Sequence, residues 1–181
     1  MIVRETRLEG VYVIELAPRS DERGTFCEAY NGKALLDAGI DLVVDQVNVS
    51  RSDKRGTVRG MHWQETPYGQ KKLVRCTRGA AIDVIVDVRP DSKTCGEWIA
   101  VELFPEGWKS VFIPQGFAHG WQALEDQSEI EYCTEGLWHK ESERGISPLD
   151  SKVGIRWVTE VKNVAPRDLG WPAFGPAVMG R

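Results

Sequence analysis

The sequence is poor in the residues that most often build metal and redox centres. Its 181 residues include four cysteines and three histidines, and no two cysteines form a CxxC pair. This spacing excludes zinc fingers, iron–sulfur clusters and thioredoxin-like redox motifs. Scattered cysteines in a chain without an evident export signal are typical of the reducing cytoplasm, where we expect this protein to reside.

Long apolar runs and an excess of positive charge are also missing. No run approaches the roughly 18 residues that a membrane-spanning helix needs, and four charged residues among the first ten argue against a secretory signal peptide. The formal net charge is −4. A nucleic-acid-binding domain usually carries a net basic face, so we expect neither nucleic acid nor a membrane as partner.

What the chain does contain is the periodicity of β-strands. Short runs rich in β-branched and aromatic residues, separated by turn signals, occur at residues 11–16, 81–88, 98–103, 110–113 and 128–134. Many short strands at a spacing of roughly 8–12 residues predict an all-β sandwich or barrel. No repeat or linker interrupts the pattern, so we expect a single domain over residues 1–181.

Helical signals are few. Residues 32–38 predict one short helix with Leu35 and Leu36 facing inward, Asn31 as its cap and Gly39 as its stop. The tail from about residue 164 contains three prolines and predicts irregular structure or a short helix.

Two histidine segments resemble the paired motifs of the cupin superfamily, which are jelly-roll β-barrels. Gly56 is followed after five residues by His62, and Gly107 precedes a run from Pro114 to His119 that reads Pro-Gln-Gly-Phe-Ala-His. The resemblance implies a cupin jelly-roll barrel or sandwich with a few short helices. Metal-binding cupins offer a second histidine where this chain has Gln64. A first-row metal needs three or four ligands, so we expect a metal-free cupin.

The three histidines have different surroundings. His139 lies in a charged stretch and is expected to face solvent. His119 fits a supporting role in a pocket wall as well as it fits chemistry. His62 is the best candidate for a base.

An extended chain around His62 raises a difficulty. Because strand residues alternate faces, Gly60, His62 and Gln64 share one face. Arg59 and Met61 then point to the other face, unless a bulge re-aims one of them. The sequence leaves open whether Arg59 and His62 reach one pocket.

Positive charge is concentrated in two segments despite the acidic balance. Arginine and lysine offer hydrogen bonds and charge that suit a phosphate or diphosphate, and a solvated basic face is the alternative. The two groups are Arg51, Lys54, Arg55 and Arg59, and then Lys71, Lys72, Arg75 and Arg78.

Residues 2–172 as a whole resemble the dTDP-4-dehydrorhamnose 3,5-epimerase family, a metal-free branch of the cupins. Each matching piece is modest, but all occur in order at matching spacing. The pieces are residues 21–24 with Phe26 and Glu28, residues 46–50, 58–64, 70–74, 83–89 and 113–120, Tyr132, and residues 167–168.

The resemblance implies a nucleotide-diphosphate 4-keto-6-deoxy sugar as substrate, epimerisation at C3, C5 or both, no cofactor, and a homodimer. It implies His62 as general base, Tyr132 as general acid on the opposite face, and Lys72 as stabiliser of the enolate oxygen. Asp168 would hydrogen-bond His62. The positions implied to hold substrate are Arg23, Glu28, Gln46, Asn48, Arg59, His119, Glu143 and Arg167, with Arg59 the best candidate for the diphosphate. Phe26, Gln64 and Trp138 are further candidates for substrate binding.

Several alternatives stay open at this level. Taken without the family, Asp168 fits an exposed tail residue or a helix cap, and Tyr132 fits a strand tyrosine at an interface. Leu137-Trp138 stands where many members have a tyrosine pair, which leaves open the nucleotide base, the sugar and the number of centres. The competing functions are a single-centre epimerase of a CDP- or GDP-linked sugar, a non-catalytic sugar-nucleotide-binding cupin, and a metal-dependent cupin enzyme.

Overall fold

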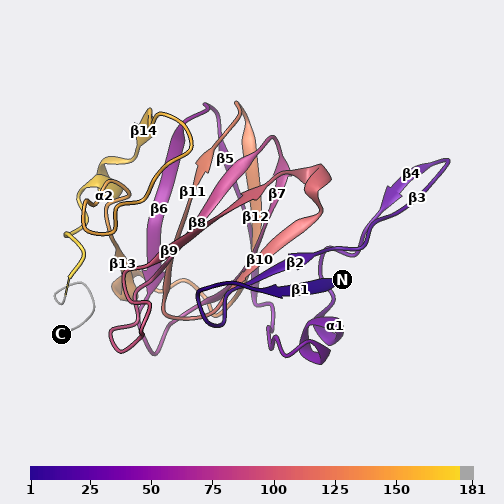
Figure 1. Ribbon diagram of the computed structural model, residues 1–181, viewed down its shortest axis with the longest axis horizontal. Helices are drawn as coiled ribbons and strands as arrows, with labels where there is room; N and C mark the ends of the chain where they lie inside the picture. Colours follow the sequence, from indigo (N-terminus) through magenta and orange to yellow (C-terminus); the bar gives the residue numbers. More distant parts are fainter. Residues whose placement is uncertain (176–181) are drawn as a thin grey trace.

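In the computed structural model, which describes residues 1–175, two β-sheets pack face to face (Figure 1). The first sheet has the strand order β1-β2-β10-β7-β12-β5, and the second has the order β13-β6-β11-β8-β9, with β14 pairing with β6. Strands β3 and β4 form a separate hairpin. The expected all-β fold is therefore confirmed.

The strands and helices have the following bounds. The first sheet contains β1 Ile2–Glu5, β2 Tyr12–Glu15, β5 Gln46–Ser52, β7 Lys71–Arg78, β10 Lys109–Ile113 and β12 Ser128–Glu135. The second contains β6 Thr57–Gln64, β8 Ala81–Asp87, β9 Trp98–Leu103, β11 Phe117–Ala123, β13 Glu143–Gly145 and β14 Asn163–Val164. The others are β3 Arg19–Asp21, β4 Gly24–Phe26, helices α1 Gly32–Asp37 and α2 Pro166–Leu169, and the 3-10 turns Pro105–Gly107 and Lys140–Ser142.

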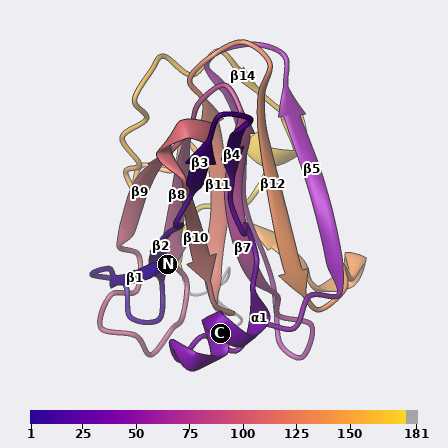
Figure 2. The ribbon, with the colours of Figure 1, turned by 90° about the vertical axis from the view of Figure 1, so that its right-hand side faces the viewer.

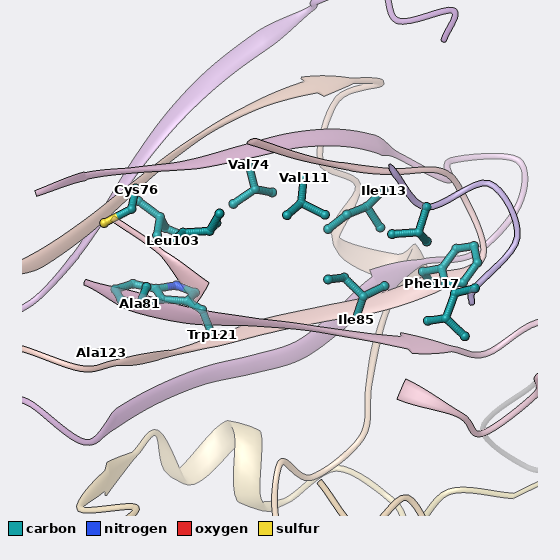
Figure 3. Close-up of a cluster of buried hydrophobic side chains, with 13 residues drawn as sticks. Val74, Cys76, Ala81, Ile85, Leu103, Val111, Ile113, Phe117, Trp121 and Ala123 are labelled. Atoms are coloured by element: carbon teal, nitrogen blue, oxygen red, sulfur yellow. The ribbon is translucent and has the colours of Figure 1, made fainter. Parts of the chain in front are cut away.

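The main core lies between the two sheets. Alternate residues of each strand point inward, so Val74 and Val111 of the first sheet meet Ile85 and Trp121 of the second (Figure 3). Each fully buried side chain of this kind contributes about 1.5–3 kcal/mol. All five runs predicted from the sequence form strands, because this alternation is what the sequence records directly.

Two smaller cores cover the outer faces of the sandwich. On the second sheet, Met61 and Trp63 of β6 pack against Ile146 and Val153 from the C-terminal part of the chain. This packing holds the C-terminal segment across β6, where α2 lies close to the strand (Figure 1). On the first sheet, Leu73 and other residues pack against α1 and the segment after it.

Helix α1 confirms one part of its prediction and corrects another. The Asn31 side chain caps the helix by accepting a hydrogen bond from Ala34 N–H at 3.0 Å, and Gly39 follows the helix with φ +83°. Leu35 is buried, but Leu36 is 59% exposed, so its predicted inward orientation is wrong. Successive helical residues are about 100° apart, and a helix of one and a half turns presents only Leu35 to the sheet.

The tail forms the short helix α2, as one of the two predicted alternatives had it. Residues 176–181, which also belong to that predicted tail, lie outside the described residues. Across residues 1–175, no helix is long and apolar enough to cross a membrane.

Candidate active site

A cavity of about 460 Å³ lies within the sandwich and takes residues from both sheets. A smaller cavity of about 180 Å³ shares His62, Lys72 and Tyr132 with it and extends to Arg59 and His119. The larger one is lined by Gln46, Asn48, His62, Trp63, Gln64, Gln70, Lys72, Tyr132, Thr134, Trp138, Glu143 and Arg167.

Strand alternation and register place one wall of this site. On the first sheet, Thr134 of β12 pairs with Lys72 of β7 and with Gln46 of β5. Two residues along β12, Tyr132 pairs with Asn48 of β5. Because these positions share one face of the sheet, amide, ammonium and phenol groups from three strands line the same space.

A β-bulge on β6 resolves the difficulty over Arg59. His62 pairs with His119, whereas Arg59 pairs with Trp121, so three steps on β6 match two steps on β11. The extra residue moves Arg59 to the face of His62, and both line the smaller cavity. Met61 remains fully buried in the outer core. The bulge that the sequence left open is therefore present.

Glycine is required at the bulge. Gly60 has φ +118°, and a Cβ atom there would lie 2.6 Å from Gly120 Cα and 2.8 Å from the His119 carbonyl oxygen. The two strands approach each other more closely than a side chain would permit. The histidine motif therefore includes its glycine for a geometric reason.

His62, whose side chain is 26% exposed, pairs with the buried Asp168 of α2. Its Nε2 lies 2.7 Å from Asp168 Oδ1, and Asp168 Oδ2 accepts a hydrogen bond from Gly60 N–H at 3.1 Å. Asp168 is only 4% exposed. The interpretation as an exposed tail residue, which the sequence favoured when read without the family, is therefore wrong, because the C-terminal segment folds back over β6.

The carboxyl group of Asp168 is held in its charged form. Burial alone would raise its pKa, but the hydrogen bond and charge of His62, the Gly60 N–H and the charge of Arg167 together lower the pKa below its ordinary value. An ionised carboxylate favours a proton on Nε2 of His62, which leaves Nδ1 as the basic ring nitrogen.

Burial also shifts the pKa values of Tyr132 and Lys72. Burial raises the pKa of the Tyr132 phenol, partly opposed by the charge of Arg59, so the phenol stays protonated. Burial lowers the pKa of the Lys72 ammonium to about 8, although the charges of Asp83 and Glu143 oppose this shift. A neutral phenol and a largely protonated amine at neutral pH therefore face the same cavity as His62.

Two residues that the sequence analysis did not assign lie against this site. Trp171 packs edge-on against His62 with ring centroids 6.3 Å apart, and it lies directly over Gly145. Asp83 of β8 lies 2.6 Å from His119 Nε2. Nothing in the sequence marks Trp171, but an acidic residue inside the apolar run 81–88 is a detectable signal.

The other predicted residues near the cavity have distinct partners. Glu143 and Arg167 form an ion pair at 2.9 Å, and the Gln46 amide donates to Asn48 at 2.7 Å. The Gln64 amide donates to the carbonyl oxygens of Tyr68 and Leu137 and accepts from His139 N–H. Gln64 therefore anchors the loop that carries Trp138.

His139 is not simply a solvent-facing residue. Although 38% of its side chain is exposed, its ring stacks on Tyr68 with centroids 3.8 Å apart. This stack and the bonds of Gln64 hold the same loop. Trp138 remains 55% exposed beside the cavity.

Three predicted substrate-binding residues lie elsewhere in this chain. Arg23, Phe26 and Glu28 belong to the β3–β4 hairpin and its exit, which project from the side of the molecule opposite α2 (Figure 1). Arg23 pairs with Asp21, and Phe26 is 67% exposed. Phe26 and Glu28 line a separate cavity beside α1. The fold of one chain does not bring them to His62.

Both histidines near the cavities bond to carboxylate groups. His62 and His119 each bond a different aspartate, and within residues 1–175 no group of three or more histidine, cysteine, aspartate or glutamate side chains could hold a metal ion. The absence of a bound metal from the working protein stays a prediction.

Comparison with known proteins assigns the family. The model of the dTDP-4-dehydrorhamnose 3,5-epimerase family matches residues 5–175. The chain belongs to this family. The enzyme of that name from Shigella flexneri is 39% identical over 175 residues, 96% of each chain.

Solved structures agree with this assignment. The epimerase from Bacillus anthracis, solved with TDP and PPi bound, has a TM-score of 0.93 at 32% identity and covers 96% of this chain and 99% of its own. A 3'-monoepimerase from Streptomyces bikiniensis, solved with dTDP-quinovose, has a TM-score of 0.87 at 35% identity, covering 93% and 85%. The expected cupin fold and enzyme class are confirmed: this epimerase is an isomerase of dTDP-4-keto-6-deoxy sugars, and the non-catalytic alternative is set aside.

Proposed function

We propose that this protein inverts C3 and C5 of a dTDP-linked 4-keto-6-deoxy sugar, with His62 as general base and Tyr132 as general acid. The observation that carries the proposal is the placement of these groups on opposite sheets. The His62–Asp168 pair lies on β6 and α2, whereas Tyr132 lies on β12, and both side chains line one cavity. Inversion at carbon needs a base and an acid on opposite faces of the sugar ring.

The chemistry requires no cofactor. The C4 ketone acidifies the neighbouring C–H bonds, because the electron pair released from carbon delocalises onto the ketone oxygen. Nδ1 of His62 takes the proton, and the ammonium of Lys72 stabilises the resulting enolate oxygen. Tyr132 then donates its phenolic proton to the opposite face of the same carbon, and solvent restores both side chains.

The diphosphate and the nucleotide base of the substrate can be bound by other side chains that line the cavities. Arg59 and Arg167 offer guanidinium forks that match diphosphate oxygens, and both line the connected cavities. The half-exposed ring of Trp138 can stack on the thymine base, although it lacks the hydroxyl of a tyrosine. The relatives bound to TDP and dTDP-quinovose favour thymidine over cytidine or guanosine.

Incubation with dTDP-4-keto-6-deoxyglucose in D₂O, followed by NMR, tests the proposal. We expect deuterium at both C3 and C5, with the L-configured sugar as product. Deuterium at C3 alone would make this protein a monoepimerase like the Streptomyces bikiniensis neighbour. Absence of exchange at both carbons would overturn the proposal.

Replacing Tyr132 with phenylalanine separates the two proton transfers. We expect net inversion to fall by about 10²–10⁴-fold because no acid remains on the second face. Exchange of deuterium into the starting sugar should fall much less, since His62 can still remove the proton and return one to the same face. Equal losses of exchange and inversion would contradict an acid role for Tyr132.

We also propose that the protein is a homodimer in which the β3–β4 hairpin of one protomer completes the site of the other. Arg23 and Phe26 are exposed and distant from His62 in their own chain, which supports this arrangement. Strand β5 forms an open edge of the first sheet beside β12 (Figure 2), and Val47 and Val49 on it are more than half exposed. A second copy would cover such an apolar edge.

Mixing two inactive variants tests the shared site. If Arg23 acts in the partner's cavity, a dimer of one Arg23→Ala and one His62→Ala protomer has one intact site. A statistical mixture should then recover about a quarter of wild-type activity. His62→Ala mixed with Tyr132→Phe is the matched control, because both residues lie in one cavity and no intact site can form. Recovery no greater than this control would contradict the shared site.

A further inference from the structure

A second histidine–carboxylate pair, which the proposed reaction does not use, reaches the smaller cavity through its histidine, His119. Asp83 Oδ1 lies 2.6 Å from His119 Nε2, and Asp83 is fully buried while the His119 side chain is 8% exposed. Asp83 lies on the inward face of β8 between Ala81 and Ile85, both members of the main core. A carboxylate therefore sits where the strand pattern expects an apolar side chain.

Only one oxygen of this carboxylate is satisfied. Asp83 Oδ2 is buried and has no hydrogen-bond partner among the described residues. A buried carboxylate oxygen without a partner is destabilising, so stability alone does not account for this residue. The neighbouring acid of the same strand, Asp87, is different, because Arg89, Ser92 and Thr94 all bond to it.

The position of the His119–Asp83 pair bears on Lys72 of the facing sheet. Burial lowers the pKa of the Lys72 amine, and among the charges that oppose this shift Asp83 contributes most and Glu143 second. His119 lines the smaller cavity together with Lys72, His62 and Tyr132. The ionisable groups that line the two cavities around Lys72 are Arg59 and His62 of β6, His119 of β11, Tyr132 of β12, Glu143 of β13 and Arg167 of α2.

We propose that Asp83 is a positioning residue of the reaction, which holds Lys72 as an ammonium ion and fixes the orientation of His119. This inference rests on the proposed role of Lys72 at the enolate oxygen. The burial of Lys72 brings its pKa to about 8, so the ammonium is retained at neutral pH by a small margin. Loss of the nearby negative charge makes the ammonium easier to deprotonate.

The Asp83→Asn variant tests this role because asparagine keeps the shape and can still bond His119. We expect the pKa of Lys72 and the alkaline limb of the kcat profile to move to lower pH by about one unit. At pH 8.5 kcat should fall about ten-fold relative to the wild type, and at pH 6.5 by less than about three-fold. Affinity for dTDP should stay within about three-fold, since Asp83 is fully buried and lines neither cavity.

Two further variants separate positioning from a structural role. Asp87→Asn is the matched control: it removes a buried charge from the same strand, and it should lower stability without moving the pH profile. In a Lys72→Arg background, Asp83→Asn should no longer shift the alkaline limb, because arginine stays charged throughout the range. A shift of equal size in Asp87→Asn, or an unchanged profile in Asp83→Asn, would overturn the inference.

NMR titration of ¹³C-labelled lysine gives a readout without turnover, and the spectrum of Lys72→Arg assigns the resonance. If the wild type shows no hydrogen exchange in the sugar, the proposed function fails, yet the titration still reports whether Asp83 controls Lys72. If the wild type exchanges and Lys72 titrates identically in Asp83→Asn, only the inference about Asp83 fails.

Discussion

Replacing His62 with alanine is expected to abolish both epimerisation and deuterium exchange at the sugar, with kcat lower by about 10³–10⁴-fold. His62 is the only one of the three histidines that lines the larger cavity, and Asp168 orients it at 2.7 Å. No other described side chain in the larger cavity combines a free basic nitrogen with such a partner. Exchange measured by NMR isolates the first proton transfer.

The loss of activity should depend on whether the replaced side chain lies at the cavity. His139→Ala is the matched control, because His139 stacks on Tyr68 outside the cavity and its backbone bond to Gln64 is retained. That variant should keep activity within about three-fold. Asp168→Asn should lose about 10²–10⁴-fold with the fold intact, since an amide no longer favours the required tautomer of His62. Residual exchange of wild-type size in His62→Ala would show that another group is the base.

Replacing Gly60 with alanine is expected to destabilise the second sheet strongly, although the change adds only one methyl group. The new Cβ would lie 2.6 Å from Gly120 Cα, a backbone atom of a paired strand that cannot move independently. Gly60 also has φ +118°, which side-chain-bearing residues rarely adopt. We expect the free energy of unfolding to fall by about 2–4 kcal/mol. Loss of the bulge would also separate Arg59 from His62.

Gly24→Ala is the control that isolates the steric contribution. Gly24 has φ +127°, but nothing lies within 4 Å of the Cβ position. Denaturant unfolding measures the loss of unfolding free energy in both variants. In Gly24→Ala the loss comes from the positive φ alone, whereas in Gly60→Ala it comes from the positive φ and the steric contact with β11. Equal losses of stability would mean that the approach of β6 to β11 does not require glycine. Activity assayed on the folded fraction of Gly60→Ala reports the bulge itself.

The positions of the strands could be predicted from the sequence more accurately than any other part of the fold. A run such as Trp98–Leu103 was predicted with the bounds that the structure has, because the period of two and the flanking turns are local features. Leu36 shows the limit of that approach. The pattern could not tell which of two adjacent leucines in a short helix meets the sheet, since that depends on how α1 docks.

The candidate site residues on the central strands meet through sheet register, whereas the others depend on segments that only the tertiary structure places. His62, Lys72 and Tyr132 line one cavity as the family resemblance implied. Asp168 comes from 106 positions beyond its partner, and only the packing of the C-terminal segment over β6 brings it to His62. Arg23, Phe26 and Glu28 matched the family equally well, yet the hairpin holds them away from the cavity in this chain.

The sequence by itself determined the all-β class and the family, because both are recorded in local pattern and motif, and the family resemblance named the residues that we propose as base, acid and enolate stabiliser. The tertiary structure decided which of those residues meet. The bulge at Gly60 turned Arg59 toward His62, the folded-back tail supplied Asp168, and the facing of the two sheets brought His119, the partner of Asp83, to the cavity that Lys72 lines. Long-range packing and strand register fix these distances, and neither is written in the spacing of neighbouring residues.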